Sequence, residues 1–338
     1  MNLIHRVPDF DNILAVLNCE VPKRHTLFEF FMNDNLYREV TGRTPSYNDN
    51  LDVLKYHIDA FAACGYDYAP VWGKMSFKQA ARKKKETISL NEGSVIYDRE
   101  TFENYEWPDP SLDDYSYLEQ IRSYLPGNMK LMIVGPNGLL ENAISLVGYE
   151  RLCIMIYEDE NLVIDIFNKI GSILLKYYDI TAQYDSVGIV MSNDDWGFKT
   201  QTMLSPQQLR KYVFPWHKKI VQTAHKYGKP AVLHSCGYAD EIMNDIIYDM
   251  GYDGKHSFED SIRSIEDSYE KWGGKIALLG GVDVDFLIRS SVEDITRRSR
   301  NLLEMAKYAG GYALGSGNSI PDYVPMEKYF AMTAAVLD

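Results

Sequence analysis

The chain has 338 residues, of which 46% are hydrophobic and 25% are charged, and its formal net charge is −13. This composition supports a large buried core and excludes an intrinsically disordered protein. The acidic balance argues against general binding to nucleic acid or to an anionic membrane, because both need a basic surface. The length suits two average domains or one large α/β barrel.

The N-terminal residues contain no apolar segment of signal-peptide length, and no later run approaches the roughly 18 apolar residues that cross a bilayer. The four cysteines are widely scattered, whereas a secreted disulfide scaffold is shorter and denser in cysteine. We therefore expect a cytoplasmic protein with reduced thiols.

Short apolar runs alternate with long amphipathic stretches, which is the pattern of βα units around a parallel sheet. The predicted strands are 66–72, 130–135, 186–192, 230–234, 254–257, 275–280 and 311–315. An eighth strand is expected near 94–97 or near residue 150. The predicted helices are 51–64, 158–184, 207–227, 239–250, 261–272 and 291–308, with start signals at Ser205 and Ser291.

We predict a single domain over residues 1–338, because no linker or repeat divides the chain. The segment 87–117 interrupts the βα rhythm and is rich in aromatic and acidic residues. It is interpreted as an insertion that folds over one end of a barrel, and an ordinary surface hairpin is the alternative.

A strand that ends in His234, followed by Cys236 and Gly237, places an imidazole and a thiol two residues apart. Both groups are ligands of soft metals. A thiolate, an imidazole and one carboxylate would suit zinc with an open coordination position. The alternative is a hydrogen-bonded histidine next to a small buried thiol.

In a barrel the C-terminal ends of the strands form the functional face, and other polar residues follow the neighbouring strands. Asp194 and Asp195 could supply a metal ligand, a partner for His234 or a general base, and a helix cap is the plainer alternative. After the next strand, His256 is a catalytic candidate, and Glu259 either faces the metal or caps the following helix.

Two glycine-rich turns near the C-terminus would let a ligand approach the backbone closely. Their candidate cofactor contacts are Gly281, Asp283, Gly315, Ser316 and Asn318. Neither turn matches a nucleotide-binding loop, so a nicotinamide or ATP enzyme is not expected.

The sequences His-Ser-Cys-Gly at 234–237, Gly-Gly-Val-Asp at 280–283 and Gly-Ser-Gly-Asn-Ser-Ile-Pro at 315–321 resemble the uroporphyrinogen decarboxylase superfamily. The resemblance runs from about Thr26 to the end and is closer to the corrinoid-dependent methyltransferase branch. It implies an α/β fold, a (βα)8 TIM barrel with extra N-terminal helices outside it.

In the methyl-corrinoid:coenzyme M methyltransferases of this branch, His-x-Cys and a later cysteine bind zinc, which activates a thiol. The resemblance therefore implies that His234 and Cys236 are zinc ligands. Ser316 stands about where the later cysteine would fall, and a serine hydroxyl is a poor zinc ligand. This departure indicates a different third ligand, Glu259 or Asp194, or a substrate other than coenzyme M.

The leading hypothesis is a zinc-dependent methyltransferase that moves a methyl group between a small methylated substrate or thiol and a corrinoid protein. The corrinoid would arrive on that partner protein, and Asp194, Asp195 and His256 are the candidate catalytic residues. We expect aromatic residues such as Trp107 and Trp196 to frame the cavity. The many tyrosines would also permit a homodimer.

Two alternatives remain open. A tetrapyrrole decarboxylase would use an aspartate such as Asp67, but the Arg-rich substrate motif of that branch is absent around Arg24. The second alternative is a module that binds a corrinoid protein without catalysis. It is suggested by Ser316, which stands where the related methyltransferases have a cysteine.

Overall fold

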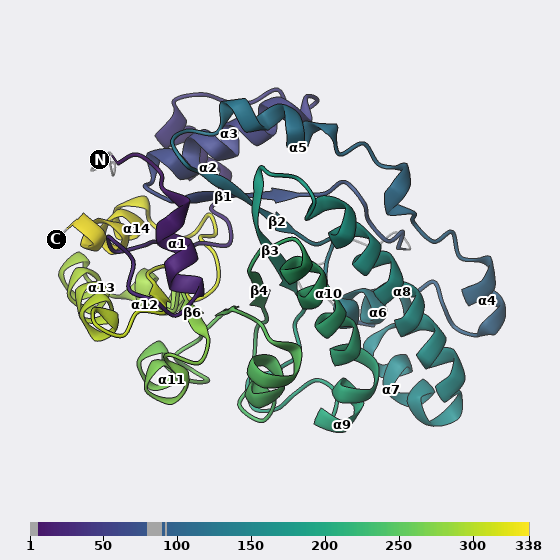
Figure 1. Cartoon of the computed structure of the whole chain (residues 1–338). Helices are drawn as coiled ribbons and strands as arrows, with labels where there is room; N and C mark the ends of the chain where they lie inside the picture. Colours follow the sequence, from purple (N-terminus) through teal and green to yellow (C-terminus); the bar gives the residue numbers. More distant parts are fainter. Residues whose placement is uncertain (1–5, 80–89, 92, 338) are drawn as a thin grey trace.

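The computed structural model describes residues 6–79, 90–91 and 93–337. Seven parallel strands form one sheet in chain order, at the positions predicted for them (Figure 1). They are β1 (Tyr68–Trp72), β2 (Lys130–Val134), β3 (Val187–Asn193), β4 (Ala231–His234), β5 (Gly254–His256), β6 (Ala277–Leu279) and β7 (Tyr312–Ala313). Nearly all of their residues are buried, as expected for a parallel sheet covered on both faces.

Helices precede, connect and follow the strands. They are α1 (Phe10–Leu17), α2 (Asp34–Thr41), α3 (Asn50–Ala63), α4 (Arg99–Asn104), α5 (Ser116–Gln120), α6 (Leu139–Val147), α7 (Tyr149–Glu158), α8 (Glu160–Thr181), α9 (Pro206–Gln208), α10 (Phe214–Lys226), α11 (Ile265–Trp272), α12 (Val284–Arg289), α13 (Val292–Ala306) and α14 (Met326–Thr333). Two predicted helices contain π-helical turns, Leu209–Val213 and Asp245–Met250.

The predicted helix starts are confirmed by their caps. The Ser205 hydroxyl accepts from the Gln208 N–H at 3.3 Å, and the Gln208 side chain accepts from the Ser205 N–H at 3.0 Å. The Ser291 hydroxyl accepts from the Asp294 N–H at 3.1 Å. These bonds satisfy N–H groups that the first helical turn leaves without partners.

The prediction of an eighth strand near 94–97 or 150 is wrong. Residues 94–97 form no strand, and residue 150 lies in α7. An extended N-terminal segment, residues 26–32, instead bridges the two edges of the sheet. Its backbone forms parallel bridges from Leu27 to Leu314 and from Met32 to Ile320, and the Tyr68 hydroxyl of β1 hydrogen bonds to the backbone of Glu29. The described residues therefore form a seven-stranded sheet completed by this segment, without a regular eighth strand.

The inserted segment 87–117 runs along the outside of α8, although its residues 87–89 and 92 lie outside the described part. Arg99 pairs with Asp165 of α8 at 2.5 Å, and Asp109 pairs with Lys176 at 2.7 Å. Its described part contains α4 and α5 and no β-hairpin. Figure 1 shows α4 at the end of the molecule remote from both chain termini.

In Figure 1, α1 and the C-terminal helices α12, α13 and α14 appear on the same side of the view, and α1 contacts β7. In the described part of the chain, none of the helices combines the length and apolar character needed to span a bilayer.

Gly315 lies directly against the backbone of the N-terminal segment at Phe28, so a side chain at this position should destabilise the fold. A Cβ atom at Gly315 would lie 1.7 Å from the Phe28 carbonyl oxygen, so Gly315→Ala forces the segment away from β7. We expect the free energy of unfolding to fall by about 3 kcal/mol in urea titrations. Gly274→Ala is the comparison, because Gly274 has open space around it and its φ of +74° imposes on alanine only the smaller cost of a left-handed backbone. Equal losses in the two variants would contradict the steric explanation.

Candidate metal centre

Three side chains converge at the C-terminal ends of β3 and β4. One ligand atom from each of Asp195, His234 and Cys236 lies within 4.8 Å of the other two. The register pairs Asn193 with His234, so the loop after β3 runs beside the loop after β4. The Cys236 N–H donates to Asp195 Oδ1 at 2.8 Å, which holds the two loops together.

His234 is positioned by a second buried histidine. The Nδ1 atoms of His234 and His256 lie 2.7 Å apart, so one ring donates a proton and the other accepts it. With His234 as the donor, its Nε2 keeps a lone pair, and this atom lies 3.6 Å from Cys236 Sγ. That tautomer is the one that could bind a metal beside Cys236.

Burial controls the ionisation of the three groups. Burial, followed by the charge of Lys255, lowers the pKa of His234 to about 3, so its imidazole is neutral. Burial and the neighbouring Asp195 carboxylate raise the pKa of Cys236 to about 12, and burial also raises the pKa of Asp195. A cation bound between these groups would favour the thiolate and the carboxylate.

The chemistry of the three donors fits zinc, and so does the spacing of His234 and Cys236. His234 Nε2 and Cys236 Sγ are 3.6 Å apart. Tetrahedral zinc, with bonds of about 2.3 Å to sulfur and about 2.0 Å to nitrogen, would place these atoms about 3.5 Å apart. Nitrogen, sulfur and carboxylate oxygen are all ordinary zinc ligands, and three protein ligands leave a fourth position for a substrate.

Two further side chains donate to the sulfur of Cys236. Asn318 Nδ2 lies 3.2 Å from Sγ, and the Ser257 hydroxyl lies 3.4 Å from it. Hydrogen bonds to a thiolate favour the charged form, and both contacts lower the pKa of Cys236 against the larger effect of burial. Of the residues predicted to contact a cofactor, Asn318 thus lies directly against the group.

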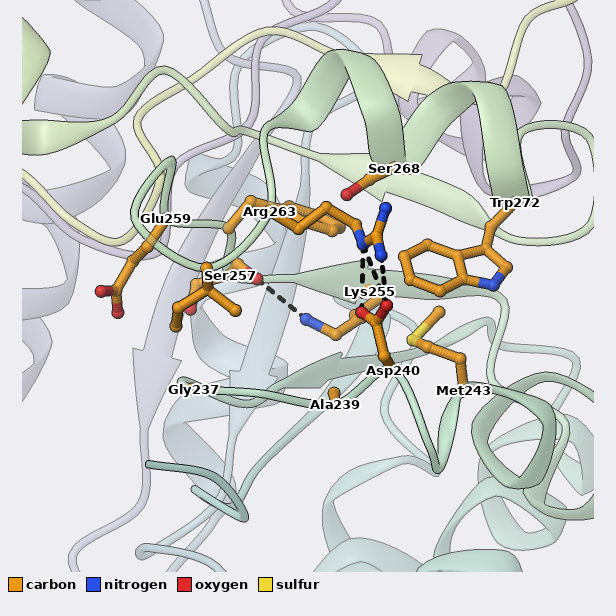
Figure 2. A pocket seen from close by; sticks show the side chains of 12 residues that line it. Gly237, Ala239, Asp240, Met243, Lys255, Ser257, Glu259, Arg263, Ser268 and Trp272 are labelled. Atoms are coloured by element: carbon orange, nitrogen blue, oxygen red, sulfur yellow. Dashed lines mark hydrogen bonds and ion pairs between the residues drawn. The ribbon is translucent and has the colours of Figure 1, made fainter. Parts of the chain in front are cut away.

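A buried ammonium group ties the strand ends behind the site. Lys255 lies on the opposite face of β5 from His256, because side chains alternate along a strand. Its Nζ donates to the Ser257 carbonyl at 2.8 Å and approaches the Ser235 carbonyl at 3.5 Å. Figure 2 shows Lys255 reaching toward Ser257, with the Arg263–Asp240 ion pair beside it. Burial lowers the pKa of Lys255 to about 8.

Ser316 hydrogen bonds to Glu29, a residue that the sequence analysis did not predict as part of the site. Its hydroxyl donates to Glu29 Oε1 at 2.6 Å, and its N–H donates to Glu29 Oε2 at 3.1 Å. Glu29 is fully buried, and burial raises its pKa to about 8. Ser316 therefore anchors the N-terminal segment.

Asp194 is saturated by four donors. Its carboxylate accepts from the Leu140 and Glu141 N–H groups at 3.0 Å each, from Trp196 Nε1 at 2.8 Å and from His217 Nε2 at 2.9 Å. The predicted alternative of a helix cap describes this residue, because it caps α6. Trp196 is fully buried, and its Nε1 is used by Asp194.

The other residues predicted for the site lie around the group. Glu259 is outside the set of ligand atoms within 4.8 Å, and its side chain points away from Lys255 (Figure 2). Asp283 caps α12 by accepting from the Asp285 and Phe286 N–H groups. Gly281 packs against Ile265, where a side chain would clash.

Two hollows border the group. A cavity of about 470 Å³ adjoins His234, and an open hollow of about 1000 Å³ adjoins Asn318, with Glu259 and Asp283 in its wall. Trp107 of the insertion does not line the cavity, but it packs on Phe77, which does.

A family comparison matches the uroporphyrinogen decarboxylase family over residues 66–338, which is most of the chain. The chain belongs to the uroporphyrinogen decarboxylase family. This membership confirms the resemblance seen in the motifs after β4, β6 and β7. A search of curated protein sequences found no match.

Among solved structures, a methyltransferase from Methanosarcina mazei matches with a TM-score of 0.71 and 17% identity, over 96% of this chain and 97% of that one. At this identity the likeness shows a shared fold. A Listeria monocytogenes protein described as a vitamin-B12-independent methionine synthase gives a TM-score of 0.48 and 12% identity, over 93% of this chain and 98% of that one. A B12-independent methionine synthase from Shewanella sp. W3-18-1 gives 0.42 and 13%, over 67% of each chain.

Glu29 makes the stability dependent on pH. Because its folded pKa of about 8 is above its ordinary value of 4.5, its stabilising contribution is present at low pH and is lost as pH rises through 8. We expect Glu29→Gln to gain stability relative to wild type by up to about 1.4 kcal/mol per pH unit between pH 5 and 8. Urea unfolding at pH 5.5, 7 and 8.5 measures this difference. The exposed control Glu270→Gln should show none, and a difference independent of pH in Glu29→Gln would refute the assignment.

Proposed function

We propose that this protein is a zinc-dependent methyltransferase that moves a methyl group between a small methylated substrate or thiol and a corrinoid protein. The observation that carries the proposal is the convergence of Asp195, His234 and Cys236 in a chain of the uroporphyrinogen decarboxylase family. The shared fold of the M. mazei methyltransferase supports it.

When bound, zinc would supply a Lewis acid that keeps a thiol ionised or polarises the heteroatom of a methyl donor. The protein prepares this position through the partners of each ligand. His256 holds the ring of His234, and Asn318 and Ser257 hold the sulfur of Cys236. Phe30 packs on the His234 ring, with 4.4 Å between ring centroids, and limits access of water.

The open hollow beside Asn318 is the proposed approach for a corrinoid carried on a separate protein. It lies at the C-terminal ends of the strands and is much larger than the cavity on the other side of the group. Two reactants could thus approach the metal from different sides.

The position of Asp67 argues against the decarboxylase alternative, in which this aspartate would be catalytic. Asp67 immediately precedes β1, at the end of the sheet opposite the site, and it is engaged by Arg24 and by the Asp9 N–H. Product formation from uroporphyrinogen would restore this alternative. The non-catalytic module would instead bind a corrinoid protein tightly without turnover on any methyl donor.

Metal analysis tests the proposal first. Protein purified without chelators or metal-affinity columns should contain near-stoichiometric zinc by elemental analysis. His234→Ala and Cys236→Ser should lose the metal, because each removes a donor from a three-ligand site. Asp195→Asn should weaken zinc binding, whereas Glu259→Gln should retain it.

Methyl transfer is the second half of the same test. Cys236→Ser should abolish transfer to or from a methyl-corrinoid protein while keeping the wild-type circular dichroism spectrum. Full turnover in this variant, or a wild type that takes up no zinc when it is supplied, would refute the proposed mechanism.

Removing the ammonium group of Lys255 should lower the affinity for zinc without lowering the free energy of unfolding. Lys255→Met keeps the length of the side chain but frees the Ser235 and Ser257 carbonyls, and loss of such supporting contacts typically costs 10–100-fold in metal affinity. Stability should be unchanged or higher, because a buried ammonium is costly. Competition with a chelator measures zinc affinity. Lys271→Met is the control, since that half-exposed lysine pairs with Asp240 and does not reach the Ser235 and Ser257 carbonyls. Equal affinities in the two variants would contradict this role.

A further inference from the structure

The cavity beside His234 offers hydrogen-bond acceptors on its polar side. Asn193 is nine-tenths buried, its Nδ2 donates to Glu141 Oε2 at 3.1 Å, and its Oδ1 has no partner among the described residues. Glu141 Oε2 also accepts from the Gly138 N–H at 2.8 Å. A buried acceptor without a partner is costly, so this wall favours a ligand that donates hydrogen bonds.

The opposite side of the cavity is aromatic. Phe30, Phe31 and Trp72 line it, and their ring centroids are 5.2 to 6.4 Å apart in pairs. The faces of aromatic rings attract cations through the ring quadrupole, and this attraction is strongest at tryptophan.

The charges of the cavity agree with its hydrogen-bonding groups. The described lining residues include Glu141 and no lysine or arginine. Burial and the nearby Asp194 and Asp195 carboxylates raise the pKa of Glu141 to about 8, so this side chain gains from a neighbouring cation.

The cavity is close to the proposed metal position. Asn193 is the register partner of His234 on the adjacent strand, and Asp195 follows it by two residues. His234 itself lines the cavity. A ligand whose sulfur binds the metal would therefore extend a short chain toward Asn193 and Glu141.

We propose that the thiol acceptor of this enzyme is an aminothiol, whose ammonium group occupies the cavity formed by Glu141, Asn193 and the three aromatic rings. The inference rests on the proposed function. Zinc held by Asp195, His234 and Cys236 would favour loss of the thiol proton to solvent. A sulfur electron pair would form the S–CH3 bond, and the methyl–cobalt bond would break and leave its electron pair on the corrinoid of the partner protein.

Three thiols of equal carbon length test the proposal. They are 2-aminoethanethiol, 2-mercaptoethanol and 2-mercaptoethanesulfonate, with cationic, neutral and anionic ends. The Kd of each is measured on cobalt(II)-substituted protein from the thiolate-to-metal absorption band. We expect the aminothiol to bind most tightly and the sulfonate most weakly.

Glu141→Gln prevents the side chain from ionising beside a bound ammonium but keeps an oxygen for the Gly138 N–H. It should reduce the preference for the aminothiol over mercaptoethanol by about tenfold or more, as expected for a lost charge-assisted hydrogen bond. Comparing this ratio between proteins cancels the different acidities of the thiols. The exposed control Glu270→Gln should keep the wild-type ratio. An unchanged ratio in Glu141→Gln, or tighter binding of the sulfonate, would overturn the inference and leave the metal site standing.

A measurement without metal separates the two proposals. Ethylammonium should change the fluorescence of Trp72 in metal-free protein, whereas ethanesulfonate should not, and Trp72→Phe supplies the blank. Ethylammonium binding that weakens in Glu141→Gln supports the cavity assignment even if zinc binding fails. Absence of any ethylammonium effect would overturn it even if zinc binds.

Discussion

A single proton shared by two buried imidazoles governs the proposed metal centre. Because His234 and His256 meet through their Nδ1 atoms, the ring that donates there leaves its Nε2 free as an acceptor. When His234 is the donor, its Nε2 lone pair lies 3.6 Å from Cys236 Sγ. His256 at the end of β5 thus positions the ligand at the end of β4.

The proposed metal centre has acidic groups on one side of the strands and a buried ammonium group on the other. The Asp195 carboxylate and a Cys236 thiolate would carry negative charge on the site side, and the Lys255 ammonium lies behind them on the outer face of β5. Asp194 takes no part in this balance, since four donors hold it at the start of α6. Two adjacent aspartates therefore have separate tasks, one structural and one facing the proposed metal.

Periodicity predicted the seven strands, and the strand-end motif predicted His234 and Cys236, because both signals are local. The carboxylate partner was harder to predict. Glu259 and Asp195 both follow strands, and only loop direction separates them. Glu29 and Glu141 were missed, since each is buried by residues distant in the chain and neither belongs to a motif. The segment 26–32 was not predicted as a bridge because its pairing with β7 spans almost the whole sequence.

That pairing also determines when the site can be assembled during synthesis. Leu27 and Glu29 are synthesised long before their partners Leu314 and Ser316, which follow 287 residues later. Until then Glu29 lacks the two hydrogen bonds that accompany its burial, and Cys236 lacks the amide of Asn318. A nascent chain that has completed β4 already carries His234 and Cys236, but the finished pocket can form only after Ser316 and Asn318 have been synthesised.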